Sequence, residues 1–317
     1  MTRTQNLLAT LAARPLQCDG ATGTQLQSLG LQPGECCERW VLDHPDRVRL
    51  VHQRYLDAGA DLLTTNTFAG TALSLAAHGL DARAAEINRT AARLAREVAG
   101  DRAWVLGDIG PFGGILEPYG ETEPGTANDT FFDQAAALLE GGADAILVET
   151  MSDPTEAALA IAAARAAGAQ CVIATFAFQK TPMGFRTMMG ANPATAVNNA
   201  LAAGADIVGA NCGTQLTLDD YADLTAQLLS GAKLAAELTA PANTAAKSAG
   251  VPVIVQPNAG SPEHDHATGA IRYEVTPEAF AAAAARYIAL GARIVGGCCG
   301  TTPAHIAASA RLNKKQT

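Results

Sequence analysis

The chain has 317 residues, of which 48% are hydrophobic and 17% are charged, and its formal net charge is −9. This length suffices for one large domain or two ordinary ones with a buried core. The acidic balance argues against nucleic acid or an anionic membrane surface as a partner, because both attract basic proteins. Apolar runs stay short of the ~20 residues of a membrane span, and the N-terminus has no signal-peptide pattern. Since the seven cysteines lack the spacing of a disulfide framework, we expect a cytoplasmic protein.

Four copies of a short phrase divide the chain into similar units. Each copy follows an alanine-rich amphipathic segment and precedes a β-branched apolar run. A glycine at this point can take the left-handed conformation that ends a helix, so the repeating unit is a helix, a glycine stop and a strand. Such units imply parallel strands joined by crossover helices. The copies are Ala58-Gly59-Ala60-Asp61, Gly142-Ala143-Asp144, Ala203-Gly204-Ala205-Asp206 and, more loosely, Gly291-Ala292-Arg293.

Eight stretches are predicted to be strands, and eight such units across about 300 residues fit a (β/α)8 TIM barrel. We therefore predict an α/β fold of this type, in a single domain over residues 1–317. The alternative is a doubly wound open sheet, which uses fewer strands and often has a glycine fingerprint after the first one. Residues 19–23 resemble that fingerprint only distantly, so the barrel is favoured. The predicted strands are Leu16–Gly20, Leu62–Asn66, Trp104–Ile109, Ala145–Glu149, Cys171–Phe176, Ile207–Asn211, Val253–Gln256 and Ile294–Gly297.

Helix boundaries and irregular segments also leave signals. We expect the first ten or so residues and the tail 313–317 to be frayed ends. Residues 213–250 are long for one crossover, so a helix plus an insertion is predicted there. Four polar residues that precede a proline by one or two positions are expected to cap helices, namely Asp43, Asp153, Thr276 and Thr302.

Three cysteines carry the clearest chemical signal. Cys298 and Cys299 lie in the run 296–303, and Cys212 lies in the run 209–213; both runs follow an apolar, strand-like stretch. Three thiolates at two strand ends would leave a tetrahedral zinc ion with one open position, as in catalytic sites. The alternatives for the adjacent pair are two small buried residues, a strained vicinal disulfide or a phosphate-binding turn. None of them accounts for Cys212 together with the adjacent thiols.

Polar residues follow most of the predicted strands. In a barrel, catalytic side chains come from the carboxyl ends of the strands and the loops after them, so this pattern predicts a site on one face. The residues concerned are Asp19-Gly20, Thr65-Asn66-Thr67, Asp108-Ile109-Gly110-Pro111, Glu149-Thr150, Asn211-Cys212, Pro257-Asn258-Ala259-Gly260 and Cys298-Cys299.

These motifs resemble the homocysteine S-methyltransferase family. That family includes the homocysteine-activating module of cobalamin-dependent methionine synthase, betaine–homocysteine methyltransferase and the S-methylmethionine enzymes. The resemblance spans nearly the whole chain in the expected order, with one departure at Ala21, where the family usually has a second glycine. The matching residues are Asp19-Gly20-Ala21-Thr22-Gly23-Thr24, Ala58 through Asp61 with Thr65-Asn66-Thr67-Phe68, Glu149-Thr150, Asn211-Cys212, Pro257-Asn258-Ala259-Gly260, and Gly296 through Pro303.

The resemblance implies a role for each group. Cys212, Cys298 and Cys299 are expected to bind zinc, and the sulfur of homocysteine to take the fourth position. A thiol with a pKa near ~8.5 is only slightly ionised at neutral pH, so metal binding would supply the nucleophilic thiolate. The substrate-binding residues are expected to be Asp19 and Glu149 for the ammonium, backbone N–H groups near Gly20 and Ala21 for the carboxylate, and Asn211 beside the first zinc ligand.

Other cysteines and histidines are expected to have plainer roles. Cys18 and Cys171 lie within predicted strands and are expected to be inert core residues. Cys36 and Cys37 are expected to be solvent-facing thiols, with zinc binding of their own as the alternative. The pair His264 and His266 is expected to be solvated in a polar loop. Asn66 and Asn258 either take part in the site or satisfy backbone groups at its rim, and Asp19 and Glu149 have the alternative of serving as cap or salt-bridge carboxylates.

The methyl donor is the open part of the hypothesis. The run 31–38 before Trp40 looks more like the methionine-synthase branch, so a separate methyl-corrinoid protein is the preferred donor and methionine the product. S-methylmethionine, or another small sulfonium or betaine donor, is the alternative. A third possibility, from another class, is a non-catalytic barrel that binds zinc or thiols.

Overall fold

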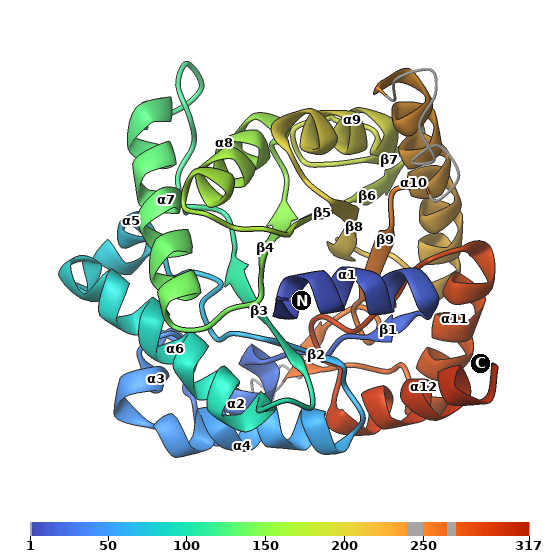
Figure 1. Ribbon diagram of the computed structural model, residues 1–317, viewed down its shortest axis with the longest axis horizontal. Helices are drawn as coiled ribbons and strands as arrows, with labels where there is room; N and C mark the ends of the chain where they lie inside the picture. The colour runs from blue at the N-terminus through green and yellow to red at the C-terminus, as the bar shows by residue number, and fades with distance from the viewer. Residues whose placement is uncertain (1, 240–249, 265–270, 317) are drawn as a thin grey trace.

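Eight parallel strands form a closed barrel with helices around it (Figure 1), so the predicted TIM barrel is confirmed. The computed structural model describes residues 2–239, 250–264 and 271–316. The strand order around the barrel is β1-β12-β9-β8-β5-β4-β3-β2, and a bridge between Cys18 and Leu62 joins the two ends of the sheet. The barrel strands are β1 (Leu16–Gln17), β2 (Leu62–Thr64), β3 (Trp104–Ile109), β4 (Ala145–Met151), β5 (Val172–Phe176), β8 (Ile207–Cys212), β9 (Val253–Pro257) and β12 (Ile294–Val295).

Helices follow the strands in the predicted alternation. Two short hairpins, β6 (Gln179–Thr181) with β7 (Gly184–Arg186) and β10 (Glu263–His264) with β11 (Ile271–Arg272), lie in the loops after β5 and β9. The helices are α1 (Arg3–Ala13), α2 (Gly23–Ser28), α3 (Trp40–Asp43), α4 (Pro45–Asp57), α5 (Ala72–Ala76), the 3-10 turn η1 (Asp81–Arg83), α6 (Ala84–Ala99), α7 (Pro124–Glu140), α8 (Pro154–Ala166), α9 (Pro193–Ala203), α10 (Leu218–Thr239), α11 (Pro277–Leu290) and α12 (Pro303–Gln316).

The predicted helix caps are confirmed in part. The side chains of Asp153 and Thr276 accept a backbone N–H in the first turn of α8 and α11. The prediction for Asp43 is wrong, because α4 starts after His44 and the Asp43 carboxylate pairs with Arg39 of the preceding turn at 2.7 Å. The Thr302 hydroxyl lies 2.8 Å from the ring of His305.

The described residues near both ends of the chain are helical, so the prediction of frayed termini is wrong. Helix α1 lies across the middle of the ring of strands (Figure 1). Its Leu7 and Leu11, one turn apart, are buried with the leucine and isoleucine side chains that fill the barrel interior. The barrel exposes an apolar end that these two leucines cover, and their burial holds the segment in place. At the other terminus, α12 continues to Gln316.

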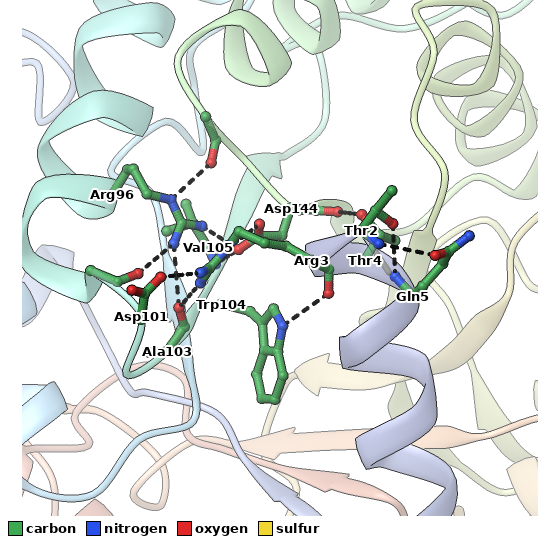
Figure 2. Close-up of polar contacts among 12 residues, drawn as sticks. Thr2, Arg3, Thr4, Gln5, Arg96, Asp101, Ala103, Trp104, Val105 and Asp144 are labelled. Carbon is green, nitrogen blue, oxygen red and sulfur yellow. Dashed lines mark hydrogen bonds and ion pairs between the residues drawn. The ribbon is translucent and has the colours of Figure 1, made fainter.

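Hydrogen bonds and an ion pair bind α1 to the neighbouring strands (Figure 2). The Arg3 guanidinium bonds the Asp144 carboxylate at 3.0 Å and the Ala103 carbonyl at 2.7 Å. The Thr4 hydroxyl donates to the Asp144 carbonyl at 2.7 Å, and the Trp104 indole N–H donates to the Arg3 carbonyl at 3.1 Å. The N-terminal helix is therefore part of the barrel.

The structure explains the repeated phrase in the sequence. In the first three copies, the final aspartate lies just before a strand. Its carboxylate accepts a backbone N–H of a neighbouring strand and also pairs with an arginine. The fourth copy has Arg293 instead, and its guanidinium bonds the Leu11 carbonyl at the end of α1 at 3.1 Å. The N–H and arginine partners are Gln17 and Arg14 for Asp61, Val105 and Arg96 for Asp144, and Val172 and Arg165 for Asp206.

The segment 213–250 contains one long helix. Helix α10 has 22 residues and covers β8 and β9. The predicted insertion falls largely on residues 240–249, which lie outside the described residues. None of the described helices is long and apolar enough to span a membrane.

Candidate functional site

The structure brings the three predicted thiols together. Cys212 ends β8, while Cys298 and Cys299 lie in the turn after β12, and the three sulfur atoms lie within 4.8 Å of one another. The sulfur atoms of the adjacent pair are 4.0 Å apart, too far for a disulfide of about 2.05 Å. Zinc–sulfur bonds of ~2.3 Å in tetrahedral geometry separate two sulfurs by about 3.8 Å. Among the described residues, these three side chains form the one group of metal-ligand dimensions.

Backbone strain turns Cys212 toward the other two thiols. Its φ of +54° lies in the left-handed region, which non-glycine residues seldom adopt outside sites that require it. Tyr221 holds this turn by donating its hydroxyl hydrogen to the Cys212 carbonyl. The next residue, Gly213, also has a positive φ, and a Cβ there would lie 2.7 Å from the carbonyl oxygen of Phe178.

Thr301 links the thiol turn to the end of the first strand. Its hydroxyl donates to the Cys298 carbonyl at 2.7 Å and accepts the Ala21 N–H at 3.1 Å. A Cβ on Gly20 or Gly297 would lie 2.5 or 2.4 Å from the Thr301 hydroxyl oxygen, so glycine is needed at both positions. The Ala21 N–H is therefore already used within the protein. The Gly20 N–H has no partner among the described residues, and it stays a candidate for binding a carboxylate.

Charge is shared unequally among the three thiols. Hydrogen bonds from Cys298 and Cys299 lower the pKa of Cys212 to about 3. The hydrogen bond with Cys212 raises the pKa of Cys299 to about 12 and that of Cys298 well above its usual value. Three thiolates this close would repel one another, so their full deprotonation requires a cation between them. This donor set fits zinc.

Asn258 supplies a further donor at the edge of the site. Its amide hydrogen-bonds Cys212 and lowers the pKa of that thiol, and its Nδ2 donates to the Gly213 carbonyl at 3.3 Å. Its Oδ1 is buried and has no partner among the described residues. A buried acceptor without a partner is an exception among protein side chains, so this oxygen is a candidate contact for a bound group. Asn66, the other asparagine in question, satisfies a backbone group through its bond to the Cys37 carbonyl at 2.8 Å.

Tyr273 is a site residue that sequence reasoning missed. Its side chain hydrogen-bonds Cys299, and burial together with the nearby thiolates raises its pKa to about 12. Its ring covers Gly300, where a Cβ would lie 2.1 Å from the ring. The backbone nearby is fixed because the Val275 N–H donates to the Ala259 carbonyl at 3.1 Å and the His305 ring bonds the Val275 carbonyl at 2.8 Å. No motif marks this tyrosine, which follows the β10–β11 hairpin.

Removing the Tyr273 hydroxyl tests its role at the thiol site. Tyr273→Phe keeps the ring over Gly300 but removes the hydrogen bond to Cys299, and loss of such outer partners weakens metal binding by roughly 10- to 100-fold. Zinc affinity measured by competition with a chelator is expected to fall by this factor. Tyr287→Phe is the matched control, since the Tyr287 hydroxyl bonds the Leu218 carbonyl at 2.8 Å, away from the thiols. Equal zinc affinities for both variants would exclude this role.

A cavity of about 380 Å³ is lined by the three thiols and by acidic residues. Four carboxyl groups line it, and its lining contains no lysine, arginine or histidine among the described residues. Burial raises the pKa of Glu149 to about 8 and that of Asp19 to about 7, and it raises the pKa of Asp108 well above its usual value. Glu38 is the fourth carboxyl. The cavity therefore combines thiols and carboxyl groups in its lining.

Asn211 fixes Glu149 in this cavity. The register between β4 and β5 shifts between Val148 and Met151, and Thr150 has a φ of +60°. The Asn211 amide donates to Glu149 Oε2 at 3.1 Å and accepts the Thr150 N–H at 2.9 Å. Asn211 is fully buried and is not among the lining residues. The expected substrate contact of Asn211 is therefore replaced by a positioning role.

The remaining cysteines lie apart from the metal-sized group. Cys18 and Cys171 are buried core residues, as expected. The prediction of solvent-facing thiols is wrong for Cys36, which is buried against Trp40 and its neighbours, and for Cys37, whose thiol donates to Asn66 Oδ1 at 3.0 Å beside the cavity. The loop folds back onto the apolar cluster, which covers both side chains. The predicted solvation of His264 and His266 falls on side chains outside the described residues.

Fold and site together define a (β/α)8 barrel with a three-thiol site at the carboxyl ends of its strands. The model of the homocysteine S-methyltransferase family matches residues 16–312. The chain belongs to this family and is a methyltransferase. The run of thiols and glycines at residues 296–303 lies within the matched residues.

Similar proteins extend this assignment. The methionine synthase of Mycobacterium leprae (strain TN) is 34% identical over 97% of the chain, and that of Mycobacterium tuberculosis (strain ATCC 25618 / H37Rv) is 33% identical over 95%. The chain spans 25% of the length of each of these relatives. The metallated form of the homocysteine methyltransferase MmuM from Escherichia coli superposes with a TM-score of 0.73 at 21% identity, covering 94% of this chain and 96% of that one. At this identity the likeness supports the fold.

Proposed function

We propose that the chain transfers a methyl group to the thiol of homocysteine in a zinc-dependent reaction that gives methionine. The observation that carries this proposal is the cavity that is lined both by the three thiols and by four carboxyl groups. Homocysteine has the complementary groups, a thiol and an ammonium group. A barrel that held zinc without binding a thiol substrate would not need the carboxyl groups.

Different residues of this cavity have different proposed roles. Cys212, Cys298 and Cys299 would hold zinc, which keeps a bound substrate sulfur deprotonated at neutral pH with a lone pair free for attack. The carboxyl groups of Glu149 and Asp19 would pair with the substrate ammonium, whose positive charge favours their ionised forms despite burial. The N–H of Gly20 is available for the substrate carboxylate.

A methyl-corrinoid protein is the proposed methyl donor. A quaternary ammonium donor needs an aromatic cage, and the cavity lining has two aromatic residues among those described, Phe68 and Tyr273. Trp40 is buried under Arg47, and Phe112 is buried elsewhere, while Tyr119 lines a separate cavity of about 630 Å³. The similarity to methionine synthases is consistent with this donor.

A small sulfonium donor such as S-methylmethionine is the second candidate. The acidic cavity favours it, because carboxyl groups stabilise a cation in a partly buried site.

Donor assays separate the candidates. Free methylcobalamin is expected to support slow methionine formation and betaine none, whereas robust turnover with S-methylmethionine alone would establish the second candidate.

Homocysteine binding tests the proposal directly. The zinc-loaded protein is expected to contain about one zinc per chain and to release close to one proton per site when homocysteine is added at pH 7, because a protonated thiol becomes a bound thiolate. Absorption at the zinc edge is expected to gain a fourth sulfur at ~2.3 Å. A coordination shell that stays unchanged at saturating homocysteine would contradict the proposal and leave a barrel that binds metal without activating the thiol.

A further inference from the structure

The side-chain amide of Asn211 is held in one orientation inside the barrel wall. Asn211 lies next to the last residue of β8, and its side chain is fully buried. Its Oδ1 accepts the Thr150 N–H at 2.9 Å and the Thr175 hydroxyl at 2.8 Å. A backbone N–H can only donate, so the atom that faces it must be the amide oxygen. The amide nitrogen, Nδ2, is therefore the atom that meets the neighbouring acceptors.

Three acceptors lie within reach of the Asn211 Nδ2 atom. It lies 2.7 Å from Thr150 Oγ1, 3.1 Å from Glu149 Oε2 and 3.9 Å from Cys298 Sγ. An amide nitrogen carries two hydrogens, so it cannot give each of the three acceptors a full hydrogen bond. The hydrogens of this amide are thus shared between a carboxyl group of the cavity and one of the three thiols.

Each of the three thiols has one polar side chain beside it, and Asn211 differs from the other two. The Asn258 Nδ2 also donates to a backbone carbonyl, that of Gly213. The Asn211 Nδ2 instead also donates to an acid of the cavity lining. Asn211 is therefore the side chain that connects a thiol with a carboxyl group. The three pairs are Asn258 with Cys212, Tyr273 with Cys299, and Asn211 with Cys298.

Metal binding would change the competition for the Asn211 amide. A cysteine binds zinc as the thiolate, and a hydrogen bond to an ionised acceptor is about twice as strong as one to a neutral acceptor. Three thiolates also outnumber the two positive charges of zinc, so the loaded site carries a net negative charge that an N–H donor offsets. Outer partners of this kind orient metal ligands and tune the affinity for the metal. The bond from Asn211 to Cys298 is such a contact.

We propose that Asn211 couples the zinc ligand Cys298 to the carboxyl group of Glu149 by sharing one amide between them. When one acceptor becomes weaker, the amide bonds the other acceptor more strongly. A positively charged ligand that pairs with Glu149 would release the amide for Cys298, and by linkage the zinc-loaded protein would hold that ligand more tightly. Asn211 is a positioning residue, because it lies outside the cavity lining and acts through these two side chains. This inference rests on the proposed function, since it takes the three thiols as zinc ligands.

A double-mutant cycle on zinc affinity tests the coupling. Affinity is measured by competition with a chelator for the unmodified protein, Asn211→Ala, Glu149→Gln and the double variant. Asn211→Ala is expected to weaken zinc binding by roughly 10- to 100-fold, as for other outer partners of metal ligands.

The effect of Glu149→Gln is then compared with and without the Asn211 amide. Its direct effect through lost charge is present in both backgrounds and cancels in the cycle. A neutral amide oxygen is a weaker acceptor than a carboxylate, so Glu149→Gln is expected to be more favourable to zinc binding when Asn211 is present. The difference is expected to be at least about 2-fold, the lower limit for residues of one hydrogen-bond network. Additive effects in this cycle would overturn the coupling.

A cobalt-loaded protein gives a second readout, which a purely structural role of Asn211 would not move. The thiolate-to-cobalt charge-transfer absorption moves to longer wavelength when a thiolate loses an N–H donor, and this shift is expected for Asn211→Ala. Thr175→Val, which removes the hydroxyl that holds the Asn211 Oδ1, is expected to show a smaller shift in the same direction. It also serves if Asn211→Ala does not fold. An unchanged absorption in both variants would overturn the bond to Cys298 and the coupling with it.

Two matched controls lie away from the thiols. Asn88 is also a fully buried asparagine, but its amide donates to the Gly70 carbonyl at 2.7 Å and lies outside the cavity lining. Thr4 is a buried threonine whose hydroxyl bonds the Asp144 carbonyl. Asn88→Ala and Thr4→Val are expected to keep the zinc affinity and the cobalt absorption of the unmodified protein, and equal changes in the controls would overturn the specific role of Asn211. Failure of the unmodified protein to bind zinc would overturn the proposed function with it.

Discussion

Cys298→Ala is expected to remove bound zinc and to bring methionine formation below detection. Two thiolates remain at the site, and a neutral methyl group cannot replace a ligand that binds zinc as a thiolate. Cys298 also hydrogen-bonds both of the other thiols, with the Cys299 sulfur at 4.0 Å. Its loss therefore disrupts the charge sharing among the three thiols as well as the ligand count.

Zinc content after dialysis, measured by mass spectrometry, checks this result alongside the methylation assay. Cys171→Ala is the matched control, because Cys171 is a fully buried thiol in the barrel interior away from the cavity. That variant is expected to lose some stability through the cavity it creates but to keep its zinc. A Cys298→Ala protein with full activity and no metal would end the zinc hypothesis.

The barrel was predictable from the sequence because its signals are local. Each glycine stop before an apolar run places one helix end and one strand start, as at Gly204, which takes the left-handed conformation at the end of α9. The observed strands begin within one residue of the predicted ones, and they differ mainly at their carboxyl ends. At Asp19, for example, the chain leaves the sheet, and the Asp19 carbonyl accepts the N–H of Gly297 in the turn after β12.

The three thiols of the site were predictable because their signal is also local in the sequence. Cys212, Cys298 and Cys299 directly follow strands, and in a closed barrel the carboxyl ends of all strands meet on one face. Asp108 follows this rule too, but no pattern in the sequence reports that its oxygens lack donors. That property emerges only when the partners of every neighbouring acid are known.

Residues brought in by loops were not predictable. Tyr273 reaches Cys299 through the hairpin after β9, and the thiol of Cys37 reaches Asn66 because its loop folds back onto the barrel. Neither path follows from hydrophobic periodicity. The N-terminal helix was missed for a related reason, because the end of the barrel that buries Leu7 and Leu11 exists only in the folded protein.

Asp144→Asn is expected to destabilise the protein by about 3 kcal/mol, since removing one partner of a buried ion pair leaves the other charges uncompensated. The Asp144 side chain is 5% exposed and joins Arg96, Arg3 and the Val105 N–H. It thus connects α6, α1 and β3 at the end of the barrel opposite the thiols (Figure 2). Asparagine preserves the shape but removes the charge that both arginines share.

Urea unfolding followed by circular dichroism at pH 7.5 measures this effect, and hydrogen exchange reports whether the amides of α1 lose protection. Asp219→Asn is the matched control, because Asp219 also pairs with an arginine, Arg286, but its side chain is 85% exposed. An exposed pair contributes less than about 1 kcal/mol, so this variant is expected to unfold close to the unmodified protein. Equal midpoints for the two variants would show that the Asp144 carboxylate contributes little to the stability of the fold. A larger loss for Asp144→Asn, with exchange concentrated in α1, would establish the carboxylate as the link between the N-terminal helix and the barrel.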